Sequence, residues 1–79
     1  MIPLAFARDG SLVRVVMIRG GGLRRRLIEL GISEGKNLRV VRSLGHGPVI
    51  VESAENSGRL VLGFGVAMKI MVEEVPYER

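Results

Sequence analysis

The residues of this chain that could do chemistry gather in one stretch, GGGLRRRLIELGISEG, at positions 20–35. Glycines between a strand and a helix are typical of phosphate-binding loops, because they let the backbone approach a phosphate closely. Here, however, Arg25 occupies the position of the third small residue in the dinucleotide-binding pattern. No acidic residue sits about 20 positions on in a second parallel strand, where a ribose would need it. We therefore interpret the glycines as turn residues that supply positive φ angles.

Metal ligation would have to start from the single histidine, His46, because the chain contains no cysteine. Zinc and iron sites combine several ligands of the histidine, cysteine or carboxylate type. His46 lies between glycines in an expected hairpin turn, and the spacing of the acidic residues supplies no co-ligands. We interpret His46 as a solvated turn residue, with metal ligation as the alternative, and assign Met17, Met68 and Met71 to packing.

The sequence gives no support for catalysis. It holds no Ser-His-Asp or Cys-His arrangement, and its adjacent acids Glu73 and Glu74 lie on an expected strand. Successive side chains on a strand point to opposite faces, so these two carboxylates cannot act as a pair. We predict that the protein is not an enzyme.

The chain is basic, with twelve Lys and Arg residues against eight Asp and Glu residues and a net charge of +4. Such a surplus favours nucleic acid, an anionic surface or an acidic protein as partner. The aromatic residues that single-stranded nucleic acid would stack on are scattered, at Phe6, Phe64 and Tyr77. A small basic barrel that binds RNA or DNA therefore remains an alternative, and nucleic acid is not the expected partner.

Length and hydropathy predict one small domain with an aliphatic core. The chain has 79 residues, of which 47% are hydrophobic and only 4% aromatic. The longest apolar run, 60–68, is about half of the ~20 residues that a membrane-spanning helix needs, and no signal peptide is visible. We expect a soluble cytoplasmic protein that would meet a membrane only through a partner.

The alternation of apolar and polar residues predicts five short strands joined by glycine-rich turns, one of them at 55–58. In the first strand, the alternation places Met17 on the same face as Val15 and Ile18 on the opposite face. In the second strand, it places Arg39 and Arg42 on opposite faces. The expected strands cover residues 11–21, 36–43, 48–52, 59–63 and 69–75.

A helix is expected over 22–31, with a narrow apolar stripe. At about 100° per residue, Leu23, Leu27 and Leu30 fall on one side of the helix, so we expect all three to pack against the sheet. Gly31 is expected to end the helix in the left-handed conformation.

The three arginines of this helix, Arg24, Arg25 and Arg26, cannot form one flat basic patch. Successive residues are turned by about 100°, so these side chains fan around the rest of the circumference. Arg25 and Glu29 are four residues apart and could form an ion pair worth at most a few tenths of a kcal/mol.

The order of these pieces resembles the FeoA family of ferrous-iron transport accessory proteins. The family signature is G-G-x-x-x-x-R-L-x-x-L-G-[IL]-x-x-G, followed by a hairpin, an apolar Leu-Gly strand and a terminal A-x-x-I-x-V. The resemblance covers roughly residues 3–75. The matching residues are Gly20, Gly21, Arg26, Leu27, Leu30, Gly31, Ile32 and Gly35, and then Ala67, Ile70 and Val72.

The resemblance implies a single FeoA-like domain, 1–79, with a mainly β fold. This fold would be a small SH3-like barrel of about five strands with a short helical insertion after the first strand. The residues expected to maintain this structure are those of the signature, Gly20, Gly21, Arg26, Leu27, Leu30, Gly31, Gly35 and Ala67.

The same resemblance implies a non-enzymatic role in ferrous iron uptake. FeoA-like proteins act in the cytoplasm beside FeoB, a membrane ferrous-iron transporter, so the chain is expected at the inner face of the membrane through this partner. We expect Arg24, Arg25 and Glu29 to contact FeoB, and the alternative interpretation of the arginines is a solvated face of the helix. No cofactor is evident, and weak binding of Fe(II) or another divalent metal stays open. The alternative is a metal-responsive regulatory domain related to the C-terminal domains of DtxR-type repressors.

Overall fold

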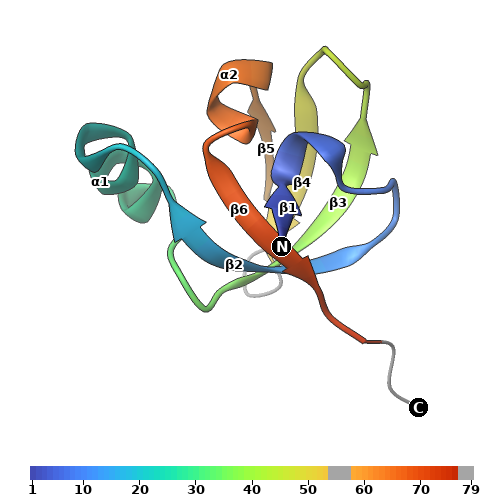
Figure 1. The fold of residues 1–79 in the computed structure, drawn as a ribbon, viewed down its shortest axis with the longest axis horizontal. Coiled ribbons are helices and arrows are strands. Elements are labelled where there is room, and N and C mark those ends of the chain that lie inside the picture. Colours follow the sequence, from blue (N-terminus) through green and yellow to red (C-terminus); the bar gives the residue numbers. More distant parts are fainter. Residues whose placement is uncertain (54–57, 77–79) are drawn as a thin grey trace.

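The fold is one antiparallel sheet whose six strands curl around an aliphatic core (Figure 1). The computed structural model describes residues 1–53 and 58–76. The strand order is β1-β6-β2-β3-β4-β5, so β1 and β5 form the two edges and the sheet is not closed. The elements are β1 (Ile2–Pro3), the 3-10 helix η1 (Leu4–Phe6), β2 (Leu12–Ile18), α1 (Gly21–Glu29), β3 (Asn37–Ser43), β4 (Val49–Ser53), β5 (Arg59–Leu62), α2 (Phe64–Ala67) and β6 (Ile70–Glu74).

The mainly β architecture with a helix after the first long strand is confirmed, and all five predicted strands exist. The structure adds three short elements that the sequence did not predict, β1, η1 and α2. Each has two to four residues, which is too short for a hydrophobic period to develop. Most of the turn predicted at 55–58 lies outside the described residues, and so does Tyr77.

A β-bulge in β2 turns the side chains that follow it to the other face of the sheet. Val15 lies opposite Val72 of β6, whereas Met17 lies opposite Met71, so β2 has one extra residue between the two pairs. Ile18 therefore points into the core and is 6% exposed, while Met17 is 43% exposed. The alternation predicted from the sequence is wrong for both residues, because a bulge shifts the period of two by one.

A second bulge in β3 has the same effect on two arginines. Val40 lies opposite Val51 of β4, whereas Arg42 lies opposite Ile50. Since cross-strand partners share a face, Arg42 lies on the same outer face as Arg39. The prediction that these arginines lie on opposite faces is wrong.

The core is built from aliphatic side chains, as the composition predicted. Val and Ile dominate the long strands because β-branched side chains fit a half-buried pleated surface. The buried residues are Leu4, Ala5, Ala7, Val13, Val15, Ile18, Leu27, Ile32, Leu38, Val40, Val49, Val51, Leu62, Ala67, Ile70 and Val72.

The strand β6 occupies a central place although it comes last in the described chain. It pairs with β1 on one side and with β2 on the other, both antiparallel. The pairing with β2 aligns Arg14 with Glu73, whose side chains form an ion pair of 3.2 Å. The first and last long strands of the domain are thus neighbours.

Candidate partner-binding site

Glycines with positive φ flank the helix α1 on both sides. Gly20 has a φ of 92° and accepts, at its carbonyl oxygen, a 2.9 Å hydrogen bond from the amide of Arg24. At the other end, Gly31 has a φ of 89°, and the amide of Ile32 donates to the carbonyl of Leu27 at 2.8 Å. The helix therefore stops at Glu29, and the left-handed conformation predicted for Gly31 is confirmed.

Only one side chain of α1 is buried. Leu27 is 2% exposed, and Leu23 is half-buried against the core. Leu30 is 52% exposed, so the prediction that it packs against the sheet is wrong. The reason is geometric, because Leu30 lies just past the last helical residue and α1 stands to one side of the sheet (Figure 1).

An ion pair fixes α1 to the turn that precedes β3. The guanidinium of Arg24 donates from Nε to one carboxylate oxygen of Glu34 at 2.8 Å and from Nη2 to the other at 3.1 Å. These hydrogen bonds lower the pKa of Glu34 below its ordinary value of 4.5 and raise the pKa of Arg24. The side chain of Arg24 thus forms an ion pair within the protein, which was not predicted from the sequence.

The turn after α1 is itself tied to the sheet. The amide of Gly35 donates to the carbonyl of Val15 at 2.8 Å, and the amide of Val15 donates to the carbonyl of Lys36 at 2.9 Å. Gly35 has a φ of 88°, which is the left-handed region that glycine tolerates best. Through Arg24 and Glu34, α1 is therefore connected to β2 as well as to its own ends.

The solvent side of α1 carries the other residues predicted to bind a partner. Arg25 and Glu29 are both exposed, and the expected ion pair between them is not formed among the described residues. Arg26 is exposed as well, and Ile28 is 43% exposed. We call these four residues the outer face of α1. Ile28 was missed because the apolar stripe was drawn through the leucines alone.

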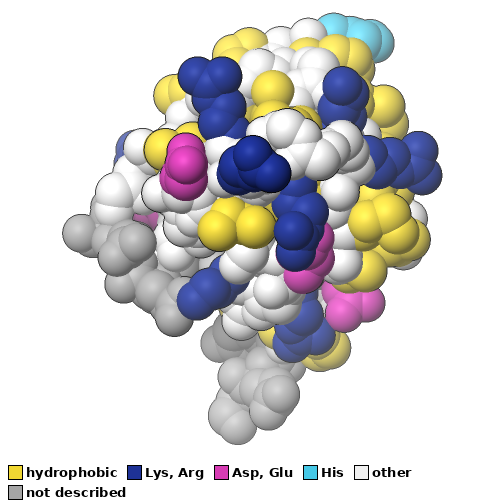
Figure 2. Space-filling view, turned by 90° about the vertical axis from the view of Figure 1, so that its left-hand side faces the viewer, with side chains coloured by type: hydrophobic (Ala, Val, Ile, Leu, Met, Phe, Trp, Pro, Cys, Tyr) yellow, Lys and Arg dark blue, Asp and Glu magenta, His cyan; other side chains and the backbone are white. Residues whose placement is uncertain are grey.

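Figure 2 shows the side of the molecule on which α1 lies. Lys and Arg side chains are spread over this side, with few acidic side chains and several hydrophobic ones between them. The arginines are separated rather than gathered in one patch, as the helical geometry predicted. This surface is suited to a partner with several acidic groups around an apolar contact.

The glycines and the alanine of the family signature serve the backbone and the core. Gly20, Gly31 and Gly35 all have positive φ, which confirms the prediction for these three. The prediction is wrong for Gly21 and Gly22, which are the first two residues of α1 and have no positive φ. Ala67 of α2 is fully buried.

His46 lies in the β3–β4 turn, away from α1 in the chain. It is exposed, and its ring centroid lies 5.6 Å from that of Phe64. Residues 1–53 and 58–76 contain no group of three or more His, Cys, Asp and Glu side chains that could hold a metal ion. His46 remains a candidate ligand that belongs to no such group in the described part of the chain.

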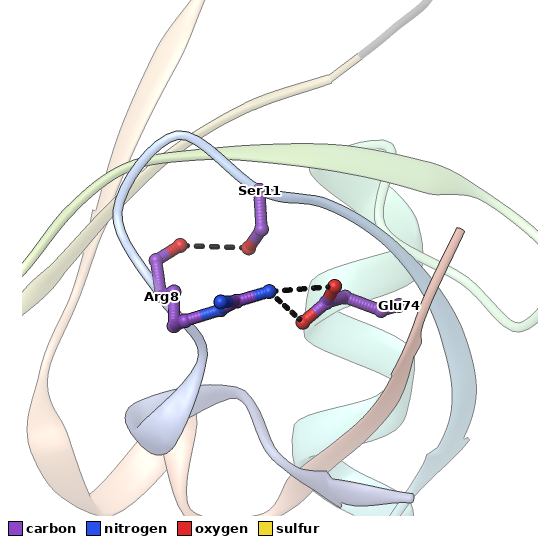
Figure 3. A network of polar contacts seen from close by, with 3 residues as sticks. All are labelled: Arg8, Ser11 and Glu74. Carbon is purple, nitrogen blue, oxygen red and sulfur yellow. Dashed lines mark hydrogen bonds and ion pairs between the residues drawn. The ribbon is translucent and has the colours of Figure 1, made fainter. Parts of the chain in front are cut away.

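A hollow beside the start of β2 is closed on one side by an ion pair (Figure 3). Arg8 donates from Nη2 to both carboxylate oxygens of Glu74, at 3.0 and 3.1 Å, and Ser11 Oγ donates to the carbonyl of Arg8 at 2.7 Å. Arg39 in the same wall donates to the carbonyl of Gly10 at 3.1 Å. Both arginines thus hold the 8–11 loop, but only Arg8 is paired with a carboxylate, whereas Arg39 forms no ion pair with a described residue.

None of the helices in residues 1–53 and 58–76 has the length and apolar character that crossing a bilayer requires.

Known proteins are similar to this chain over nearly its whole length. The family model described as FeoA domain matches residues 2–74. An Fe(2+) transport protein A of Methanocaldococcus jannaschii is 44% identical over 78 residues, which are 98% of this chain and 92% of that relative. A crystal structure of an iron uptake regulatory protein, FeoA, has a TM-score of 0.83 and 31% identity, covering 94% of this chain and 97% of that one.

Two further structures bear on the fold. Stenotrophomonas maltophilia FeoA complexed with zinc, described as a prokaryotic SH3 domain protein, has a TM-score of 0.73 and 24% identity, over 92% of this chain and 91% of that one. A manganese-dependent transcriptional repressor has a TM-score of 0.80 and 26% identity, over 92% of this chain and 41% of the repressor. The predicted SH3-like fold is confirmed, with an open sheet in place of a closed barrel. With the family model matching 2–74 and a relative at 44% identity, this chain belongs to the FeoA family.

Proposed function

We propose that this protein is a non-enzymatic cytoplasmic accessory of ferrous iron uptake that binds the cytosolic region of the FeoB transporter. The observation that carries the proposal is membership of the FeoA family, together with a relative named Fe(2+) transport protein A. The protein would reach the inner face of the membrane through FeoB.

The outer face of α1 is the surface that we propose for this contact. It projects from the sheet, is anchored by Leu27, and combines cations with the exposed Ile28. The buried Leu27, the half-buried Leu23 and one ion pair hold the helix, so the rest of its surface is open to a partner. Arg25 and Glu29 therefore stay in the proposed interface, whereas Arg24 acts by holding α1 in place through Glu34.

A pull-down with the cytosolic region of FeoB from the same genome tests the proposal. We expect Arg25→Glu to reduce capture about tenfold or more, since it places a negative charge against an acidic partner surface. Arg42→Glu is the matched control, because it makes the same change of net charge on β3, far from α1 in the fold. Capture that is equal for the two variants would remove Arg25 from the interface, and no capture of the wild type would refute the partner.

Regulation by a metal is the second candidate, favoured by the fold shared with the manganese-dependent repressor. In this case, the protein would bind Mn(II) or Fe(II) with at least about micromolar affinity, through His46 and carboxylates that assemble on binding. Isothermal titration calorimetry of the wild type and of His46→Ala tests this role. Heat that is the same for both proteins would exclude His46 as a ligand.

A further inference from the structure

Three stretches of the chain without Lys, Arg, Asp or Glu meet at one end of the fold. These stretches are residues 1–7, 43–51 and 60–68. They supply η1, the β3–β4 turn and α2, which lie in the upper half of Figure 1. Far apart in sequence, η1, the β3–β4 turn and α2 form one region of the surface.

Contacts join the three stretches pairwise. Ser43 Oγ donates to the carbonyl of Ala5 at 2.9 Å, which fixes η1 to the end of β3. The ring of His46 in the β3–β4 turn lies 5.6 Å from that of Phe64 in α2. The helices η1 and α2 also pack against each other. These contacts make the end of the molecule one continuous surface. Because the three stretches contain no Lys, Arg, Asp or Glu, charged side chains of this protein can lie only at the edge of this surface.

Large apolar side chains project from this end. Phe6 of η1 is 54% exposed and Leu44 of the turn is 51% exposed, while Phe64 of α2 is half-buried. We call Phe6, Leu44, Pro48 and Phe64 the apolar end. Leaving such side chains in water costs free energy, so their exposure at one place points to a surface that covers them.

The turn holds Leu44 in this exposed position. The amide of Gly47 donates to the carbonyl of Leu44 at 3.3 Å, and Gly45 has a φ of 72°. A Cβ at Gly47 would lie only 3.2 Å from the Leu44 Cβ. The turn thus needs its glycines, and it presents Leu44 outward from a tight backbone.

Cations without acidic partners flank the apolar end. Arg42 lies two residues before Leu44, and Lys69 follows directly after Met68 at the end of α2. The amide of Arg19 donates to the carbonyl of Lys69 at 2.9 Å, so Arg19 lies beside Lys69. All three side chains are exposed, and none forms an ion pair with a described residue.

The acids that form ion pairs lie elsewhere. Glu73 and Glu74 are at the far end of β6, and Glu52 is near the far end of β4. Figure 2 agrees with this arrangement, because hydrophobic side chains reach the top of the view with Lys and Arg side chains below them. Free cations therefore flank the apolar end, and the acidic side chain that contacts its edge is Asp9, whose Oδ1 accepts a hydrogen bond from the amide of Ser43 at 2.7 Å.

We propose that the apolar end binds directly to the surface of an anionic lipid bilayer. Apolar and aromatic side chains enter the boundary between headgroups and acyl chains, while flanking Lys and Arg side chains bind anionic headgroups. Each such cation adds about a fivefold gain in membrane affinity. A purely apolar protein partner would give no role to Arg19, Arg42 and Lys69. This contact goes beyond docking on FeoB and does not depend on it.

Co-sedimentation with lipid vesicles tests the proposal with the full chain and no partner protein. We expect the wild type to sediment with vesicles that contain phosphatidylglycerol and not with pure phosphatidylcholine, and high salt should weaken binding. The double variant Phe6→Ser/Leu44→Ser should bind about tenfold less tightly or worse, because its tip no longer buries apolar surface. Val61→Ser is the matched control, since Val61 is 66% exposed on β5, and it should bind like the wild type.

Charge variants separate this contact from the docking on FeoB. Arg42→Glu should lose vesicle binding about tenfold and keep capture by FeoB, whereas Arg25→Glu should do the reverse. Far-UV circular dichroism checks that each variant is folded. Failure of the wild type to bind anionic vesicles would overturn the proposal, and so would a double variant that binds like Val61→Ser. If the double variant instead lost capture by FeoB without any vesicle binding by the wild type, the apolar end would be a protein contact.

Discussion

Replacing Leu27 by alanine tests what holds α1 on the fold. Leu27 is the one buried residue of this helix and is 2% exposed. Truncating a buried leucine removes transfer free energy and leaves a cavity, at a cost of about 3 kcal/mol. In a domain of this size, such a loss lowers Tm by ~12–24 °C. We expect this loss in urea and thermal unfolding followed by circular dichroism.

Leu30→Ala is the matched comparison. The sequence pattern predicts that Leu27 and Leu30 share one packed stripe and cost about the same to truncate. In the structure, Leu30 is 52% exposed, so the variant should lose about 1 kcal/mol or less. Losses within about 0.5 kcal/mol of each other would refute the single anchor and restore the stripe. Hydrogen exchange adds a second readout, because the amides of α1 should lose protection in Leu27→Ala before those of β3.

Three further variants test local features of the fold. Gly35→Ala should destabilise the protein by about 1 kcal/mol, because alanine is strained at a φ of 88° although its Cβ meets no atom within 4 Å; chemical denaturation measures the loss, and an unchanged stability would contradict the left-handed turn. Arg24→Gln should raise the pKa of Glu34 toward 4.5 in an NMR titration. Since the wild-type pKa is lowered, the contribution of this pair to stability is present above about pH 4.5 and is lost as the pH falls through the folded-state value. Ile18→Ala should lower the free energy of unfolding by about 3 kcal/mol and Met17→Ala by under about 1 kcal/mol. A larger loss for Met17→Ala than for Ile18→Ala would contradict the β-bulge and support a regular alternation along β2.

The sequence predicted the strands of the fold well where the alternation of apolar and polar residues was long enough to recognise. The strands 12–18, 37–43 and 70–74 have alternating or β-branched segments of five to seven residues. The bulges could not be predicted, because one extra residue in a pair depends on the partner strand and leaves no mark in the composition. The bulge in β2 places Ile18 on the face opposite to the predicted one, and the bulge in β3 places Arg42 on the same face as Arg39.

The sequence predicted the helix of the candidate site and its exposed residues, but it did not predict the contacts that hold this helix in place. A helix with exposed Arg25 and Glu29 follows from helical geometry alone. The pairing of Arg24 with Glu34 depends on where the turn after α1 is held, which is decided by hydrogen bonds to Val15 of another element. The apolar end was hidden for the same reason, since Phe6, Leu44 and Phe64 are neighbours only after the sheet has curled.

The central place of β6 has a consequence for synthesis of the protein. Strands β1 to β5 leave the ribosome first, but β2 lacks its inner neighbour until residues 70–74 emerge. In the meantime, β2 offers an unpaired edge next to Val13 and Val15, which is a template for aggregation. Pairs such as Arg14 and Glu73, 59 residues apart, also make folding slow, because long loops must close before they are stabilised. Nascent chains that end before β6 are therefore the form of this protein that most needs a chaperone.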